Sequence, residues 1–418
     1  MAAATLIYPA TVGALAPAQF PLAPPQFLRC TTARSAARHR IFASASPLDD
    51  DEDGEYTFWD RTELFVRSGA GGDGAVAFVG RRPAGGSGGA GGTQRVLVAN
   101  TGAGAHAFFG LHLAGKLRER GHAVTILNAG DPAKVGGKGP FAQYERLERE
   151  GGVEVVWGDP ADAGALPAGE FDVVYDNNGK DLAACQGMAD RFKGRCSQYI
   201  FVSSAGMAVP PVGRPCIEED TPCKESAGHL AVERYLAEAG LPWTSFRPLY
   251  PYGPHTAKDC EHYFLDRILR GRPVCLPGPG TQLTSLTHVE DVAELLASAV
   301  GAEKAVGEVY NCCADNYYTH EGIAQIAAAA AGKECEVVTY DNAVVGLGKK
   351  EQVPFRPNHF FASAGKARRE LGWEPKHTLE GDMPALIEDF IASGRLEREV
   401  DFSADDKVLQ AVRSVANA

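Results

Sequence analysis

The chain has 418 residues, enough for one large domain or two medium-sized ones with a substantial core. Its formal net charge of −12 means that bulk electrostatics do not draw it to nucleic acid or to anionic membranes. No apolar run approaches the roughly 20 residues of a membrane span, so we expect no membrane-spanning helix. The ten cysteines include no C-x-x-C pair, which argues against a disulfide framework or a zinc site and for a reducing compartment.

The first 48 residues contain no Asp, Glu or Lys, are rich in Ala, Pro, Ser and Thr, and carry four arginines late in the segment. This composition is typical of an organelle transit peptide. Its proline-rich, hydroxylated and only late-basic character favours a chloroplast over a mitochondrion. We therefore predict a chloroplast transit peptide over residues 1–48 and localisation in the chloroplast stroma. The alternative is a disordered tail without a targeting role.

Residues 49–94 begin with a cluster of acids and end in a glycine-rich run, which predicts a disordered linker. Within the linker, Asp60–Phe78 resembles the start of the glycine-rich domain of Obg-type ribosome-assembly GTPases. The resemblance rests on Asp60-Arg61, Phe65-Val66 and Gly71–Phe78. No G-x-x-x-x-G-K-[ST] phosphate loop follows, so we assign the fragment no GTPase activity.

The body of the chain opens with a strand, a glycine-rich turn and a helix. Val96–Ala99 is a short apolar run rich in β-branched residues, and a helical pattern covers residues 108–117. This order is typical of a dinucleotide-binding βαβ unit. The predicted cofactor-binding residues of the turn are Gly102, Gly104 and Gly110. Their spacing does not match G-x-G-x-x-G, and His106 stands where a compact residue usually admits phosphate. The pattern therefore predicts the fold but leaves NAD(P) binding open.

From Arg95 onward, predicted strands and helices alternate. The further predicted strands are Ala123–Leu127, Val153–Trp157, Phe171–Tyr175 and Gln198–Val202, with helices at Ala142–Glu150 and Leu182–Phe192 among them. Alternating β and α units predict an α/β fold with a doubly wound parallel sheet and helices on both faces. We expect one Rossmann-like domain over residues 95–418, with a smaller C-terminal α+β subdomain.

Past residue 200, the landmarks resemble those of the extended short-chain dehydrogenase family, the epimerase-like group. The segments that carry the resemblance are Phe201–Gly206, Ser245–Pro248, Tyr252–Pro254, Pro277–Gly280 and His288–Ala293. The resemblance implies an NAD(P)-binding Rossmann-like fold. It also implies that the first segment is the strand that carries the family's catalytic Ser or Thr.

The family's catalytic Tyr-x-x-x-Lys is missing from this chain. Counting back from the downstream landmark Glu233 places His229 where the Lys belongs and Glu225 where the Tyr belongs. The tyrosine exchanges a proton and the lysine lowers its pKa, and Glu and His supply neither function in that arrangement. Classical oxidoreductase chemistry is therefore disfavoured. Glu225 and His229 are either an acid–base pair on one helix face or a surface pair without a catalytic role.

The fourth predicted strand ends in a polar loop. Carboxylates at the C-terminal end of a parallel strand lie where α/β folds place their sites. We predict that Asp176 and Asp181 are catalytic and hold Mg²⁺, which takes oxygen ligands, and that Lys180 contacts an RNA phosphate. The alternative is an ordinary loop with an Asx turn and a helix N-cap at Asp181.

Three basic clusters are further candidates for RNA contacts. They are Arg267, Arg270 and Arg272; Lys349 and Lys350; and Lys366, Arg368 and Arg369. Lysine and arginine supply affinity by neutralising backbone phosphates, but each cluster is also explained by a solvated charged face. Phe355, Phe360 and Phe361 either stack on unpaired bases or pack in the core. The sequence permits RNA binding without demonstrating it.

Several segments together resemble one branch of the epimerase-like group, the chloroplast stem-loop-binding proteins of 41 kDa, a-type. The segments are Asn100–Ala107, Asp176–Asp181, Ser203–Gly206, Ala227–His229, Lys258–Glu261, Asn358–Phe360 and Leu371–Glu374. The resemblance implies an RNA-binding, Mg²⁺-assisted endoribonuclease that acts on stem-loops of plastid transcripts. It also implies association with plastid ribosomes and an oligomer, either of this chain alone or with a related b-type protein. The alternatives are an NAD(P)-dependent nucleotide-sugar epimerase or reductase, and a non-catalytic ribosome-associated scaffold.

Overall fold

A computed structural model of the chain describes residues 2–10, 40–41, 58–66, 92–100, 107–135, 137, 139–177, 179–256 and 260–416. The chain forms two units, Met1–Gly85 and Gly86–Ala418. In the first unit, β1 (Ala2–Ala10) pairs antiparallel with β3 (Phe58–Val66) and parallel with β2 (Arg40–Ile41). The transit peptide at 1–48 and the linker at 49–94 stay predictions. The rest of the GTPase-like fragment, beyond Val66, lies outside the described residues.

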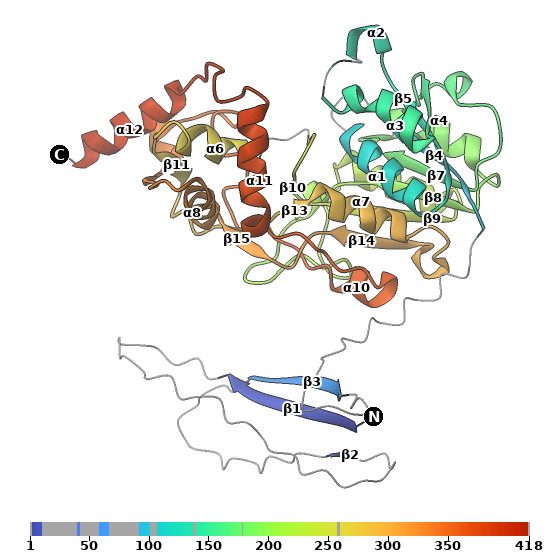
Figure 1. Ribbon diagram of the computed structural model, residues 1–418, viewed down its shortest axis with the longest axis horizontal. Coiled ribbons are helices and arrows are strands. Elements are labelled where there is room, and N and C mark those ends of the chain that lie inside the picture. Colours follow the sequence, from blue (N-terminus) through green and yellow to red (C-terminus); the bar gives the residue numbers. More distant parts are fainter. Residues whose placement is uncertain are drawn as a thin grey trace, which may run out of the picture. The chain divides into compact units, whose positions relative to one another are not determined.

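The second unit is built on a seven-stranded parallel sheet with the spatial order β14-β9-β8-β7-β4-β5-β6 (Figure 1). Its strands are β4 (Arg95–Asn100), β5 (Ala123–Asn128), β6 (Glu154–Trp157), β7 (Val173–Asn177), β8 (Gln198–Val202), β9 (Trp243–Pro248) and β14 (Glu308–Cys312). From β4 the chain first adds strands on one side and then on the other, which is the doubly wound order of Rossmann folds. The predicted fold class and the five predicted strands are confirmed.

The strands form because their residues are apolar in near-continuous runs, as expected for a sheet covered on both faces. Every residue of β7 and β8 is buried. On one face, α1 (Ala107–Glu119) and α7 (Val289–Ser298) pack against the sheet and against each other. On the other face lie α4 (Leu182–Phe192) and α5 (Gly228–Glu238). The predicted helices are confirmed, and the sheet forms the middle of three layers.

Shorter elements connect these layers. They are α2 (Pro132–Val135), η1 (Gly139–Gln143), α3 (Tyr144–Gly151), η2 (Ala163–Ala165), η3 (Ala205–Met207), η4 (Glu303–Ala305), α9 (Asn342–Val345) and α10 (Gly365–Leu371). No helix among the described residues is long and apolar enough to cross a membrane.

The C-terminal part builds a smaller α+β subdomain, as predicted. Three strand pairs belong to it: β11 (Val274–Pro277) with β16 (Val337–Tyr340), β12 (Leu283–Ser285) with β15 (Tyr317–Thr319), and β10 (Pro251–Tyr252) with β13 (Thr287–His288). Its helices are α6 (His262–Ile268), α8 (His320–Ala331), α11 (Leu379–Ala392) and α12 (Ser403–Ala416), which Figure 1 places together. A separate apolar core that includes Phe264, Leu276, Ile323 and Phe390 holds most of it together.

Local signals fix the ends of the subdomain's longer helices. The Thr319 side chain accepts a hydrogen bond from the Gly322 amide at the start of α8, and Gly332 ends that helix with a φ of 62°. The Thr378 side chain accepts from the Gly381 amide at the start of α11. Each N-cap of this kind contributes about 1 kcal/mol.

Candidate functional site

A cleft of about 1250 Å³ lies where the carboxyl ends of the sheet strands meet the C-terminal subdomain. Lys180 follows β7, and Ser203 and Ser204 follow β8 on the sheet side. His229 lies in the first turn of α5 on the same side, and residues 342–360 supply much of the opposite wall. Ligands of doubly wound folds bind at this edge of the sheet.

The cleft is positively charged in a chain with a net charge of −12. Lys180, Lys349, Lys350 and Arg356 line it, and no Asp or Glu is found among its described lining residues. The three lysines are exposed. No described carboxylate lies within 4.0 Å of their ammonium groups. A concave surface with unpaired charge of one sign concentrates ligands of the opposite sign, so the cleft suits an anion.

The guanidinium group of Arg356 is fixed across the cleft. It donates to the carbonyl oxygen of Ala208 at 3.1 Å and to that of Gly206, both in the loop after β8. Its carbon lies 3.8 Å from the centroid of the Phe360 ring, a cation–π distance. The Tyr250 hydroxyl accepts from the Arg356 backbone N–H at 3.1 Å. These contacts hold a positive charge in place before any ligand arrives.

Ser203 has a side chain that lacks a hydrogen-bond partner. The residue is 3% exposed, it lines the cleft, and its Oγ has no partner among the described residues. A buried hydroxyl left unpaired costs about 1–3 kcal/mol, so a polar group bound in the cleft would recover that energy. Ser204 differs, because its Oγ accepts from the Gly206 amide at 3.1 Å and caps η3.

His229 is placed at the cleft by the glycine before it. A Cβ added to Gly228 would lie 2.3 Å from the carbonyl oxygen of Lys180, so only glycine lets α5 begin against the loop after β7. Burial lowers the pKa of His229, although Glu233 and Asp181 act in the opposite direction. The imidazole is therefore neutral at pH 7 and able to accept a proton.

Glu225, at the position of the missing Tyr, and Glu233, the downstream landmark, have partners outside the cleft. The Glu225 carboxylate accepts from Arg234 at 2.6 and 2.9 Å on the exposed surface. Glu233 is buried and accepts from the Ser245 hydroxyl at 2.7 Å and from Arg247 at 2.6 and 3.1 Å. Neither acid lines the cleft, whereas His229 does.

Asp176 and Asp181, the predicted Mg²⁺ ligands, make the contacts expected of an ordinary loop with an Asx turn and a helix N-cap. Asp176 is fully buried and accepts from the Gly179 amide at 3.1 Å and from the Tyr199 hydroxyl at 3.3 Å. Asp181 caps α4 by accepting from the Ala184 amide at 3.1 Å. Neither carboxylate is among the described residues that line the cleft, so they do not fit a metal held there. Their catalytic and metal-binding roles stay predictions.

Of the three predicted turn glycines, Gly102 and Gly104 lie outside the described residues. A Cβ added to Gly110 would lie 2.4 Å from Oδ1 of Asn100, at the end of β4. Gly110 is thus required for close packing of helix on strand, which is one of the roles of the glycines in dinucleotide-binding turns.

Near this glycine, three asparagines at the carboxyl ends of β4, β5 and β7 form a hydrogen-bonded network, which we call the asparagine network. Asn177 Nδ2 donates to Asn100 Oδ1 at 2.6 Å, and Asn100 Nδ2 donates to Asn128 Oδ1 at 2.9 Å. The buried Tyr144 hydroxyl donates to the same Asn128 oxygen at 3.1 Å. In dinucleotide folds, an acid near this position accepts from the ribose. Asn128 Oδ1 already accepts two bonds, its full capacity, so Asn128 does not fit the ribose of a dinucleotide.

A second group has the composition of a metal site. His288, His377 and Asp382 bring their ligand atoms within 4.8 Å of one another, the one such group of three among the described residues. However, His288 Nδ1 accepts from the Glu290 amide at 3.3 Å, and the two imidazole rings stack at 3.8 Å. A metal lies in the plane of each ring that binds it, which stacked rings do not allow. The group instead joins α7 to α11.

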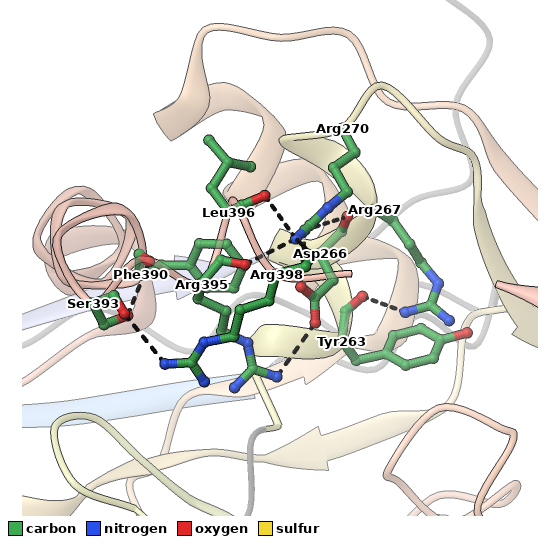
Figure 2. Close-up of polar contacts among 9 residues, drawn as sticks. All are labelled: Tyr263, Asp266, Arg267, Arg270, Phe390, Ser393, Arg395, Leu396 and Arg398. Atoms are coloured by element: carbon green, nitrogen blue, oxygen red, sulfur yellow. Dashed lines mark hydrogen bonds and ion pairs between the residues drawn. The ribbon is translucent and has the colours of Figure 1, made fainter. Parts of the chain in front are cut away.

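The predicted RNA-binding arginines lie in the arginine cluster, which we define as Arg267, Arg270, Arg272, Arg395 and Arg398 with Asp266, Asp405 and Asp406. Figure 2 shows most of this cluster around Asp266 of α6. Arg267 pairs with Asp405 at 2.8 Å, and Arg272 pairs with Asp406. Arg270 pairs with Asp266 at 2.9 Å. None of these arginines is among the described residues that line the cleft, and their RNA-binding role stays a prediction.

Comparison with known proteins places the chain among epimerase-like proteins. Residues 103–313 match the NAD dependent epimerase/dehydratase family. The chain is 36% identical over 317 residues to the chloroplast stem-loop binding protein of 41 kDa b from Arabidopsis thaliana, covering 72% of this chain and 82% of that protein. It is 29% identical over 174 residues to dTDP-glucose 4,6-dehydratase from Neisseria meningitidis, covering 40% of this chain and 47% of that enzyme.

Solved structures of epimerases share the fold. UDP-glucuronic acid 4-epimerase from Bacillus cereus, in complex with UDP-glucuronic acid and NAD, superposes with a TM-score of 0.57 at 19% identity, covering 72% of this chain and 99% of that one. UDP-glucose 4-epimerase from Bifidobacterium longum gives a TM-score of 0.57 at 20% identity, with the same coverage. At this level of identity the likeness shows the fold alone.

Proposed function

Because the chain belongs to the NAD-dependent epimerase/dehydratase family and, within it, to the family of the chloroplast stem-loop-binding proteins, we propose that it is a plastid RNA-binding protein. We propose further that its cationic cleft holds the RNA. One observation carries this proposal: four cationic side chains line the cleft, and no carboxylate is among its described lining residues. The homologue from Arabidopsis thaliana is a stem-loop binding protein by name, which supports RNA as the ligand.

The charges of the cleft match the chemistry of an RNA backbone. Protein–nucleic acid affinity comes largely from lysine and arginine that neutralise phosphates. Lys349 and Lys350 are exposed on one wall and Lys180 on the other, so a strand in the cleft would meet charge on both sides. The net charge of −12 opposes binding elsewhere on the surface. RNA binding by an acidic chain is thus explained by a local site.

The finer part of the proposal follows the family resemblance. We propose that the protein is an endoribonuclease that cleaves stem-loop RNA with Mg²⁺ in the chloroplast stroma, in association with plastid ribosomes and a b-type partner. Mg²⁺ at a scissile phosphate offsets negative charge. Because Asp176 and Asp181 have protein partners of their own, no step of the cleavage is assigned to a metal at these residues.

The first experiment incubates the full chain with a labelled stem-loop RNA, with Mg²⁺ and with EDTA in parallel. We expect a retarded complex in both conditions and cleavage with Mg²⁺. The variant K349Q/K350Q is expected to weaken binding about tenfold. The matched control K193Q/K407Q removes two exposed lysines outside the cleft lining and is expected to bind like the wild type. Equal loss in both variants would contradict the cleft as the RNA site.

The predicted Mg²⁺ ligands are tested by amide variants that remove the negative charge. D181N retains an N-cap, and D176N retains an acceptor for the Gly179 amide but loses the acceptor of the Tyr199 hydroxyl. If these carboxylates hold Mg²⁺, both variants should need more Mg²⁺ for the same cleavage rate. Unchanged Mg²⁺ dependence in both would remove the two residues from the metal site.

The two alternatives make different predictions for the same protein. A scaffold binds RNA without cleaving it at any Mg²⁺ concentration. A nucleotide-sugar epimerase or reductase carries NAD after purification, which is visible in its absorbance. The asparagine network and the loss of the Tyr-x-x-x-Lys motif disfavour the second alternative.

A further inference from the structure

Only one described residue lining the cleft is suited to take up a proton near neutral pH. Lys180, Lys349, Lys350 and Arg356 are protonated and act as donors. The lining amides are neutral, and serine hydroxyls need a base before they react. No carboxylate is present on the described lining. The Tyr250 phenol also lines the cleft, and burial raises its pKa to about 12, so it stays protonated near neutral pH. The imidazole of His229 is therefore the one group on the described lining that is suited to accept a proton.

The surroundings of His229 suit that role. The contact of Gly228 with the Lys180 carbonyl brings the start of α5 against the loop after β7, so the histidine lies beside a segment with a lysine. The Phe201 ring centroid lies 6.2 Å from that of the imidazole. The Ser203 hydroxyl, which has no partner among the described residues, lines the same wall of the cleft. A base, a cation and an unsatisfied hydroxyl therefore line one side of the cleft.

We propose that His229 is the general base of RNA cleavage in this cleft, and this inference rests on the proposed function. His229 removes the proton of a ribose 2′-hydroxyl, and the 2′-oxygen forms a bond to the adjacent phosphorus. The bond from phosphorus to the 5′-oxygen of the next nucleotide breaks, and its electron pair leaves with that oxygen, which takes a proton from water. The products are a 2′,3′-cyclic phosphate and a 5′-hydroxyl, and His229 returns its proton to solvent.

The charge of the cleft favours the same step. Attack by the 2′-oxygen places additional negative charge on the phosphate oxygens in the transition state. Arg356 is already fixed by the carbonyl oxygens of Gly206 and Ala208, so it stabilises that charge without reorganising. Burial lowers the pKa of His229, which keeps the ring in its neutral, accepting form at pH 7.

The test compares H229Q and H229N with the wild-type full chain. Both amides are close in size to imidazole and cannot act as a base at neutral pH. H255N is the matched control: His255 is exposed and outside the cleft lining, and its φ of 59° is one that asparagine tolerates. The measurements are the single-turnover cleavage rate of a labelled stem-loop, its Kd, and the chemistry of the product ends. Thermal melts confirm that each variant folds.

We expect H229Q and H229N to cleave at least about 100-fold more slowly while the Kd changes less than about threefold. H255N should cleave like the wild type. Wild-type products should carry a cyclic phosphate, and a 2′-deoxy substitution at the cleavage site should abolish cleavage there.

Two results would overturn the assignment of His229 while leaving the proposed function intact: cleavage by H229Q within about threefold of wild type, or products that end in a 3′-hydroxyl. Wild-type protein that binds RNA but never cleaves it would overturn the assignment and the nuclease, and would support the scaffold. Wild-type protein that neither binds nor cleaves RNA would overturn the proposed function itself.

Discussion

The cationic cleft and the arginine cluster both gather positive charge, but they pair it differently. In the cleft, Lys180, Lys349 and Lys350 have no described carboxylate within ion-pair distance. In the arginine cluster, Asp266 alone accepts from Arg270 at 2.9 Å and from Arg395 at 3.3 Å. The cationic side chains of the cleft are therefore available to a ligand, whereas those of the arginine cluster form ion pairs that stabilise the fold.

This difference shows why basic residues in a sequence do not by themselves mark a nucleic-acid site. Arg267 and Arg270 lie one turn apart on or next to α6, so the sequence presents them as one basic face. The structure instead directs Arg267 to Asp405 of α12, about 140 residues later in the chain. Arg270 also donates to backbone carbonyl oxygens after α11 (Figure 2). A cation contributes to phosphate binding only to the extent that the fold leaves it unpaired.

The largest effect is expected from Arg270→Ala in the arginine cluster. The substitution removes the bond to Asp266 and leaves the carbonyl oxygens of Arg395 and Leu396, at 2.9 and 3.1 Å, without their donor. Breaking a buried pair on one side costs about 3 kcal/mol, measured as the free energy of unfolding in urea. The RNA Kd should stay within about twofold of wild type. A large loss of RNA affinity with an unchanged free energy of unfolding would show that the arginine cluster binds RNA and does not stabilise the fold.

A smaller effect is expected when a carboxylate is added to the cleft by Ser204→Asp. Aspartate still caps η3 by accepting from the Gly206 amide, so the fold should be retained. The new negative charge should weaken RNA binding about tenfold. The control Ser403→Asp adds the same charge at the start of α12, beside the arginine cluster, and should leave the Kd unchanged. If both variants lost affinity equally, net charge rather than the cleft would control binding.

A histidine behind the cleft should set part of the acid sensitivity of the fold. His320 is fully buried against Phe355, neither ring nitrogen has a partner among the described residues, and burial lowers its pKa from 6.5 to about 4. The unfolded chain binds this proton more readily, so the stabilisation is complete above pH 6.5 and is lost as the pH falls toward 4.

His320→Leu removes this proton-binding group from both states. The fall in Tm between neutral pH and pH 5 should therefore be smaller by roughly 5 °C in the variant. His288, whose pKa is also lowered to about 4, is present in both proteins and contributes equally to the pH dependence of their Tm values. Identical pH profiles of Tm would contradict a neutral, buried His320.

The fold was predictable because its signals are local. Apolar runs such as Val173–Tyr175 form strands that are buried on both faces, and Asp181 caps the helix that follows. The order of alternating elements then fixes a parallel sheet. Gly110 was predicted to bind a cofactor, and this role stays a prediction; in the structure it lets α1 pack closely against Asn100 at the end of β4.

The site was less predictable because it depends on residues far apart in sequence. Lys180 was singled out from its position after a strand, but nothing local indicates that Lys349 and Lys350 lie across the same cleft. His229 appears in the sequence as a departure from the family motif, and only the cleft lining places it beside Lys180 and Ser203. The paired state of Arg267 likewise depends on a helix formed near the C-terminus.

The most direct test of the account is the salt dependence of RNA binding, measured for the wild type, K349Q/K350Q and the control K193Q/K407Q between about 50 and 200 mM salt. If the cleft contacts the RNA backbone, the slope of log Kd against log salt should be smaller by about 1 to 2 for K349Q/K350Q, because fewer counterions are released on binding. The slope for the control should equal that of the wild type. Parallel plots for all three proteins would contradict the cleft as the RNA site.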